Sequence, residues 1–258
     1  MPAVSCRSTG FVDSLTENTL RPQAAISTRD GESSAVETAA RRGVAASEAA
    51  ASARSSSPAW EWRRKLTHVV PGLIPFVMWF VYHEDPLPAW NLAVASGVVA
   101  LLTAMAIHGA RDAQRSRDEP WARTCVTYAA VPLLTLILFP ANAEFASVVL
   151  CVLAFGDAGA ALGGGLMGKR RLPWNPAKTW MGMLCFVLAA APPAIVAYWG
   201  EARPNVAWWT AVTCGATAVG PAAIAESVRS PIDDNVRICL AAAAGVVIAH
   251  HALIGAGA

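Results

Sequence analysis

Apolar residues form seven long runs after residue 65, and short polar connections separate them. Each run approaches the roughly 20 residues that an α-helix needs to cross the hydrocarbon core of a bilayer. We therefore predict spans at Leu66–Tyr82, Trp90–Ile107, Arg123–Phe139, Glu144–Met167, Thr179–Trp199, Val206–Ser227 and Asn235–Ile254. The pattern indicates an all-α fold, a polytopic membrane bundle of about seven transmembrane helices.

Residues 1–58 differ in composition, being rich in Ala, Ser, Thr and Arg with little apolar periodicity. Such a segment buries too little apolar surface to fold alone, so we expect a disordered amino-terminal tail followed by one transmembrane domain, residues 59–258. The tail lacks the apolar segment that a secretory signal peptide contains. Its Ser and Arg content fits an organellar transit peptide, but its acidic residues argue against one, because such peptides avoid acids.

Charged residues make up only 15% of the chain, against about 25% in a soluble domain. The connections before the first span and after the second, fourth and sixth hold nearly all the cations: Arg63, Arg64, Lys65, Arg111, Arg115, Arg117, Arg123, Lys169, Arg170, Arg171, Lys178, Arg229 and Arg237. The other connections hold only Arg203. This bias predicts a cytoplasmic amino terminus. We expect an integral protein of a bacterial inner membrane, with an organelle membrane as the alternative.

Tryptophans lie near the predicted span ends, at Trp62, Trp90, Trp121, Trp174, Trp180, Trp199, Trp208 and Trp209. An aromatic belt at the membrane–water interface explains this distribution without base stacking. We therefore expect no nucleic acid partner.

The fourth predicted span contains a lone carboxylate, Asp157, within the stretch GDAGAALGGGLMGKRRLPWNPAKTWMG. An ionisable residue inside a span costs about 2.5–3.5 kcal/mol on insertion scales, so it indicates function. Gly164 and Gly168 follow on the same helical face, and Lys169 and Lys178 follow outside the span. An anionic ligand, a glycine face and nearby cations suit a nucleotide triphosphate with its metal.

Each of these features has a structural alternative. Glycines at the spacing of Gly164–Gly168 usually pack transmembrane helices together. The cations at Lys169–Arg171, before the expected Pro173–Pro176 turn, are also a positive-inside signal. Helix packing does not need a carboxylate, however, so Asp157 favours the functional interpretation.

A second acidic cluster, ESVRSPIDDN, lies between the sixth and seventh predicted spans. Glu226 ends one span, and Asp233, Asp234 and Asn235 begin the next. Asp and Asn are common helix N-caps, which is the structural alternative. Capping accounts for only one of these residues. Adjacent carboxylates suit Mg²⁺, which binds one or two carboxylates together with substrate phosphates.

The segment WEWRRKLTHVVPG leads into the first predicted span. Arg64 and Lys65 precede the span, where cations mark its cytoplasmic edge, and His68 lies one turn further along. A lone histidine is more often a hydrogen-bonded structural residue than a catalytic one, so both interpretations of His68 stay open.

Three pieces in this order resemble the membrane family of CTP-dependent lipid-alcohol kinases, which includes dolichol, phytol and farnesol kinases and the fungal CTP-dependent diacylglycerol kinase. The pieces are R-K-L-T-H at Arg64–His68, the Gly156–Gly182 stretch, and E-x₆-D-D-N at Glu226–Asn235. The resemblance covers nearly all of residues 60–256. It implies CTP as donor and site residues at Asp157, Lys178 and Asp233–Asn235.

Together with the patterns above, the resemblance gives a hypothesis of Mg²⁺-dependent phosphoryl transfer from CTP to a membrane lipid alcohol at the cytoplasmic face, with residues 59–258 as the catalytic domain. The expected catalytic residues are Asp157, Lys178 and His68, with one of the aspartates as the alternative general base. The expected nucleotide-binding residues are Arg64, Lys65, Gly164, Gly168, Lys169, Thr179, Glu226 and Asn235. The expected metal ligands are Asp157, Asp233 and Asp234.

Two other functions stay open. The middle stretch is also similar to phosphatidate cytidylyltransferase, the CDP-diacylglycerol synthase, through its D-x-x-A, G-x-x-x-G-K and P-x-K-T-W-x-G elements. That enzyme's carboxyl-terminal K-D, H-G-G and D-R-x-D elements do not occur here. A transporter or scaffold with intramembrane polar residues is the non-enzymatic alternative, although we find none of the internal repeats common in transporters.

Overall fold

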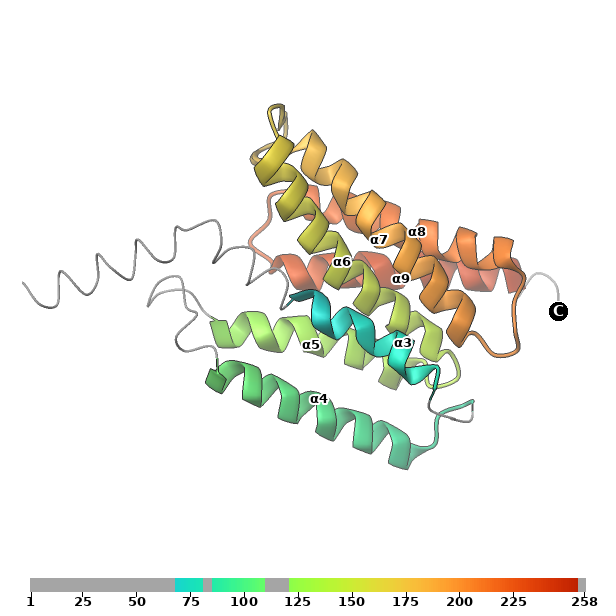
Figure 1. Ribbon diagram of the computed structural model, residues 1–258. Helices are drawn as coiled ribbons and strands as arrows, with labels where there is room; N and C mark the ends of the chain where they lie inside the picture. Colours follow the sequence, from blue (N-terminus) through green and yellow to red (C-terminus); the bar gives the residue numbers. More distant parts are fainter. Residues whose placement is uncertain (1–67, 81–84, 110–120, 255–258) are drawn as a thin grey trace, which may run out of the picture. The chain divides into compact units, whose positions relative to one another are not determined.

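Helices joined by short connections make up most of the computed structural model, which describes residues 68–80, 85–109 and 121–254 (Figure 1). The elements are η1 (Val70–Leu73), α3 (Ile74–Met78), α4 (Ala89–Gly109), α5 (Trp121–Leu138), α6 (Ala143–Met167), β1 (Arg171–Leu172), β2 (Asn175–Thr179), α7 (Trp180–Glu201), α8 (Trp208–Ser227) and α9 (Asp234–Ile254). The expected tail, residues 1–58, lies outside the described residues.

The first predicted span is not one regular α-helix over its described part. A 3₁₀-helix, η1, precedes the five-residue helix α3. Pro71 and Pro75 lie at the start of these two elements. Because proline has no backbone N–H to donate, each interrupts the regular ladder of α-helical hydrogen bonds.

The predicted fold class, an all-α membrane bundle, is confirmed. Within the described residues, α4, α6, α7 and α9 are long and apolar enough to cross a membrane. The apolar part of α5 is shorter. The helix α8, which contains three threonines and Pro221, is not among these four.

The helix α6 is the centre of the bundle, and α7 packs along it most extensively (Figure 1). Buried side chains run through it, and 56% of its most apolar window is buried. Glycines permit the close approach of α7. A Cβ atom at Gly163 would lie 2.2 Å from Cys185 Sγ, and one at Gly156 would lie 2.5 Å from the Phe186 ring. This is the small-residue packing typical of transmembrane helices.

The helix α4 lies at the edge of the bundle against α5 (Figure 1). No residue of its most apolar window is buried. Large apolar side chains such as Val94, Leu101 and Met105 are more than half exposed. An exposed apolar surface of this kind marks a membrane-facing side.

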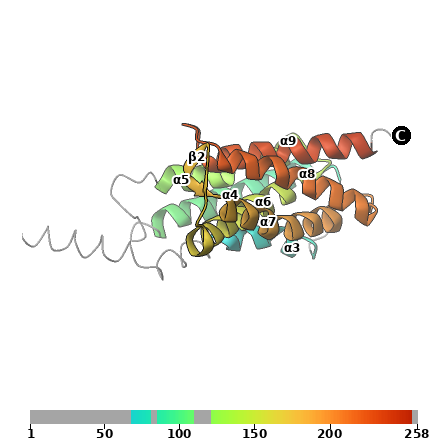
Figure 2. The same ribbon diagram turned by 90° about the horizontal axis from the view of Figure 1, so that it is seen from above.

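A small β-hairpin, which the sequence patterns do not predict, joins α6 to α7. The strands β1 and β2 pair antiparallel, with Arg171 opposite Thr179 and Leu172 opposite Asn175. The expected Pro173–Pro176 turn is therefore only the tip of a longer paired structure. Figure 2 shows β2 at the end of the bundle away from the last turn of α9.

The opposite end of the bundle holds a second polar group. The Tyr198 hydroxyl hydrogen-bonds to His250 Nδ1 at 2.7 Å, and Asn142 Nδ2 donates to Glu144 Oε1 at 3.1 Å. His250 Nδ1 also lies 3.6 Å from Glu144 Oε1. These contacts connect the start of α6 with the last turns of α7 and α9.

Candidate active site

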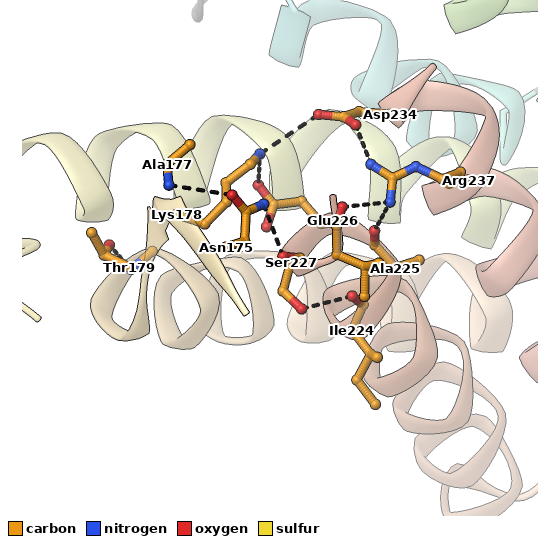
Figure 3. A network of polar contacts seen from close by, with 12 residues as sticks. Asn175, Ala177, Lys178, Thr179, Ile224, Ala225, Glu226, Ser227, Asp234 and Arg237 are labelled. Carbon is orange, nitrogen blue, oxygen red and sulfur yellow. Dashed lines mark hydrogen bonds and ion pairs between the residues drawn. The ribbon is translucent and has the colours of Figure 1, made fainter. Parts of the chain in front are cut away.

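The hairpin holds Lys178 over the end of α8 (Figure 3). Asn175 is buried, and its Nδ2 donates to the Ser227 carbonyl oxygen at 3.0 Å. Trp174 Nε1 donates to Ser227 Oγ at 3.2 Å. On the other side of the lysine, Thr179 Oγ1 accepts the Gly182 N–H at 3.0 Å and caps α7. Strand β2 is therefore fixed at both ends, and the position of Lys178 follows from this.

Lys178 lies among carboxylates from two other elements. Its Nζ is 2.5 Å from Glu226 Oε1 and 3.6 Å from Asp234 Oδ2. The Glu226 side chain is only 5% exposed, whereas that of Asp234 is 52% exposed. Glu226 is therefore the buried counterion of the lysine, and Asp234 is accessible from solvent.

Two opposing effects act on the pKa of Lys178. Burial lowers it, but the charge and hydrogen bond of Glu226, followed by the charges of Asp234 and Asp157, raise the pKa above its ordinary value overall. The lysine is therefore a cation at neutral pH. The effect of Asp157 also shows that the α6 carboxylate lies within electrostatic range of this cation.

Arg237 completes the charge network and is a residue whose role the sequence reasoning missed. Its Nη2 donates to Asp234 Oδ1, and its Nη1 donates to the carbonyl oxygens of Ala225 at 2.6 Å and Val228 at 2.8 Å (Figure 3). Arg237 thereby fixes the start of α9 against the end of α8. Its position three residues after Asp234, one helical turn away, was the available signal.

His68 lies beside Asp157 at the α6 side of the site. His68 Nδ1 is 3.9 Å from Asp157 Oδ2, and the two side chains are 16% and 25% exposed. The Tyr128 hydroxyl donates to the His68 backbone carbonyl at 2.6 Å, and the two rings meet edge to face. The structure therefore brings His68 and Asp157 together from segments 89 residues apart in the sequence, and Tyr128 of α5 supports the histidine backbone.

The other members of the acidic cluster have structural contacts. Asp233 Oδ1 accepts the Asn235 N–H at 3.0 Å, as a helix N-cap does. Asn235 is buried, and its Nδ2 donates to the Thr124 carbonyl and to Thr127 Oγ1, at 3.4 and 3.3 Å. These bonds connect α9 to α5. The structural alternative, capping, thus accounts for Asp233, while Asp234 points to the lysine.

The predicted glycine face contacts protein in this structure. A Cβ atom at Gly168 would lie 2.7 Å from Thr179 Oγ1, and one at Gly164 would lie 3.2 Å from the same oxygen. Both glycines therefore make room for the cap of α7. Lys169 is exposed. Arg64 and Lys65 lie outside the described residues.

The carboxylates of this site suit a metal ion that arrives bound to its substrate. They suit a metal ion held by protein side chains alone less well. Within residues 68–80, 85–109 and 121–254, no three His, Cys, Asp or Glu side chains are grouped as a metal cage. Mg²⁺ keeps several waters and uses one or two carboxylates plus substrate phosphates. Asp157 and Asp234 both lie in electrostatic range of Lys178 and are partly exposed, so they fit that smaller requirement.

Two curated plant proteins are similar to the chain. "Probable phytol kinase 2, chloroplastic" of Oryza sativa subsp. japonica is 25% identical over 134 residues, which are 49% of this chain and 44% of that protein. "Phytol kinase 1, chloroplastic" of Arabidopsis thaliana is 23% identical over 193 residues, which are 69% of this chain and 63% of that protein. The chain thus covers less than two thirds of either relative. No solved structure matches it.

The sequence model of the Cytidylyltransferase family matches residues 40–228, which is most of the chain. The match includes the hairpin, Asp157, Lys178 and Glu226. The chain belongs to the Cytidylyltransferase family.

Proposed function

We propose that the protein transfers the γ-phosphoryl group of CTP to the hydroxyl of a membrane lipid alcohol, in a reaction that depends on Mg²⁺. The observation that carries this proposal is the arrangement around Lys178, a cation with carboxylates from α6, α8 and α9 in electrostatic range at one end of an apolar bundle. The names of the plant relatives support a kinase reaction, and the family supports a cytidine nucleotide.

Phosphoryl transfer depends mainly on positioning and on neutralising charge. In the proposed step, the alcohol oxygen forms a bond to the γ-phosphorus while the bond from that phosphorus to the bridging oxygen breaks, and CDP leaves. The hydroxyl proton passes to His68, whose ring lies beside Asp157. Lys178 neutralises phosphoryl oxygens, and from the sequence pattern we expect Lys169 and Arg64 to add positive charge.

Asp157 and Asp234 are the carboxylates we assign to the Mg²⁺ that accompanies the triphosphate, and Asp233 precedes Asp234 at the start of α9. When bound, the ion would offset part of the negative charge of the phosphates. Glu226 has a different task. It is the buried partner that holds the Lys178 ammonium in position.

The alternative is the phosphatidate cytidylyltransferase reaction. There, a phosphatidate oxygen bonds to the α-phosphorus of CTP, and pyrophosphate leaves to give CDP-diacylglycerol. The same cation and carboxylates would serve that reaction, and the family description favours it. The names of the two plant relatives favour the kinase.

The position of the label separates these reactions. Purified protein with Mg²⁺ is given CTP labelled at either the γ- or the α-phosphate, together with phytol, a polyprenol, diacylglycerol or phosphatidate. Label from the γ-position in the lipid, with none from the α-position, is the expected result. Label from the α-position in phosphatidate-derived lipid would establish the cytidylyltransferase instead. The same assay with ATP as donor is the control for nucleotide choice.

We also propose that the site faces the cytoplasm, or the equivalent compartment of an organelle, because the sequence pattern predicts the cation-rich connections on its side. The bacterial inner membrane is our first expectation, and the chloroplast location in both relatives' names supports the organelle alternative. Seven predicted spans with a cytoplasmic amino terminus put the carboxyl terminus on the opposite side, so a reporter fused there tests the orientation.

A further inference from the structure

An apolar cavity opens beside the His68–Asp157 pair. Its volume is about 250 Å³, and its walls come from the segment His68–Ile74, from α4, from α5 and from Leu150 of α6. Along α5 the lining extends from Thr124 to Leu133, roughly 13 Å at the α-helical rise. The cavity is therefore an elongated space that runs into the membrane part of the bundle from its polar end.

The polar end of the cavity is the histidine end. His68 is a lining residue, and so is Tyr128, whose hydroxyl donates to the His68 carbonyl. Asp157 lies 3.9 Å from the His68 ring, and its charge acts on Lys178. A molecule in this cavity therefore has its tail among aliphatic side chains and its end group next to the site where we place the phosphates.

The dimensions and chemistry of the cavity suit one narrow apolar chain. Its volume lies below the roughly 300–1,000 Å³ of common small-molecule sites. The described lining residues include no Lys or Arg to meet a phosphate headgroup. Thr124 and His68 offer hydrogen bonds suited to a neutral hydroxyl.

We propose that this cavity binds the tail of a neutral, single-chain lipid alcohol and presents its hydroxyl to His68. This inference rests on the proposed function, and it makes the acceptor a one-tailed alcohol. At about 250 Å³, the cavity leaves no room for a second acyl chain beside the first, as diacylglycerol or phosphatidate would need. Because no residue of the apolar window of α4 is buried, we expect the chain to enter from the bilayer along this helix.

Photolabelling of the unmodified protein gives the first test. A long-chain alcohol with a diazirine near the tail end is irradiated with the full-length protein in lipid nanodiscs without nucleotide, and the labelled peptides are sequenced. We expect label within residues 99–106 and 124–133, and competition by phytol but not by phosphatidate. Label confined to the outer, lipid-facing residues of α6–α9 would overturn the inference, even if the protein phosphorylates alcohols.

A pair of neighbouring alanines gives the second test. Ala129 lines the cavity, while the neighbouring Ala130 is exposed and is not a lining residue. Because Ala129→Phe fills the space, we expect its KM for a long-chain alcohol to rise about tenfold or more, a change of the size that overpacking produces, with the KM for CTP unchanged. Ala130→Phe should resemble the unmodified protein.

Three further results distinguish the cavity assignment from the kinase assignment. Equal effects of the two phenylalanine variants would overturn the cavity assignment, as would faster phosphorylation of diacylglycerol than of any single-chain alcohol. Specific labelling of the cavity by a protein that phosphorylates no alcohol would support the binding site and reject the proposed kinase function. If Ala129→Phe does not fold, the position of the photolabel on the unmodified chain still supports or overturns the binding site.

Discussion

Lys178 Nζ lies 2.5 Å from Glu226 Oε1 and thereby connects the hairpin to the end of α8, 48 residues further along the chain. Because Glu226 is buried and Asn175 bonds to the neighbouring Ser227 carbonyl, this contact fixes hairpin and helix together. The same ammonium is the group we assign to the phosphates. One residue thus has a structural and a chemical role, which variants can separate.

Lys178→Met should lower turnover with CTP by about 10²–10³, as loss of other charge-stabilising groups does. It should also lower the melting temperature in detergent, because Glu226 is left as a buried carboxylate, at a cost of about 1–3 kcal/mol for this partly exposed pair. The double variant Lys178→Met/Glu226→Leu should regain the melting temperature and stay inactive. Recovery of activity in the double variant would show that the lysine acts only through folding.

The raised pKa of Lys178 predicts how this contribution depends on pH. A lysine whose folded-state pKa lies above its unfolded value contributes stability below the unfolded pKa and loses it as pH rises through the folded pKa. The difference in melting temperature between the unmodified protein and Lys178→Met should therefore stay constant from about pH 7 to about pH 9. It should shrink only above the ordinary lysine value of 10.5. A difference that disappears near neutral pH would contradict a stable ion pair.

Asp157→Asn should abolish CTP-dependent phosphorylation while the protein still inserts into the membrane. The asparagine keeps the shape of the side chain but removes the charge that lies beside His68 and acts on Lys178. Because we assign Asp157 to Mg²⁺, any residual activity should need a higher Mg²⁺ concentration. Glu144→Gln alters a carboxylate at the opposite end of α6 and is the control for a carboxylate-to-amide change in this helix. Near-normal activity in Asp157→Asn would reject the assignment.

Sequence patterns indicated the helical bundle and several residues of the candidate site. Asp157 and Lys178 were singled out from one segment, and Glu226 and Asp234 from a second. The structure places the three carboxylates in electrostatic range of the lysine. A carboxylate in an apolar run is visible in one dimension because its cost is local. Which distant groups it meets depends on the fold.

The features that the sequence patterns did not predict have physical causes as well. The hairpin contains Pro173 and Pro176, which argue against strands because proline cannot donate to a ladder, yet two short strands form around the turn. The glycine pattern showed that another group approaches α6 closely, but it did not identify that group. In the structure Gly156, Gly163 and Gly168 meet α7 and its cap. Spacing alone does not separate a face for a helix from a face for a phosphate.

Two glycines of α6, two residues apart, provide a matched test of helix packing. A Cβ atom at Gly163 would meet Cys185 Sγ at 2.2 Å and Cys185 Cβ at 2.5 Å, whereas one at Gly165 would have nothing within 4 Å. Gly163→Ala should therefore lower the melting temperature, at a cost of about 1–3 kcal/mol. Gly165→Ala should be neutral or slightly stabilising, since alanine is the better helix former by about 1 kcal/mol.

A second-site change distinguishes a clash from other causes. Because the clash is with the side chain of Cys185, the double variant Gly163→Ala/Cys185→Gly should be less unstable than the two separate losses added together. If the effects simply add, α6 and α7 do not meet at these residues.

We expect His250 to stabilise the folded protein without taking part in catalysis. It bonds Tyr198 and lies beside Glu144, connecting α6, α7 and α9. From Asp234 it is 16 residues along α9, roughly 24 Å at the α-helical rise. His250→Ala removes one partner of a mostly buried polar group, at a cost of about 1–3 kcal/mol, so the melting temperature should fall.

The KM for CTP in His250→Ala should not change below that melting temperature, because the nucleotide site is at the other end of the bundle. The neighbouring His251 is exposed, and its ring meets that of His250 edge to face. His251→Ala is therefore the matched control, and it should lower the melting temperature much less and leave the KM for CTP unchanged. A large rise in the KM for CTP in His250→Ala at low temperature would mean that the two ends of the bundle are coupled.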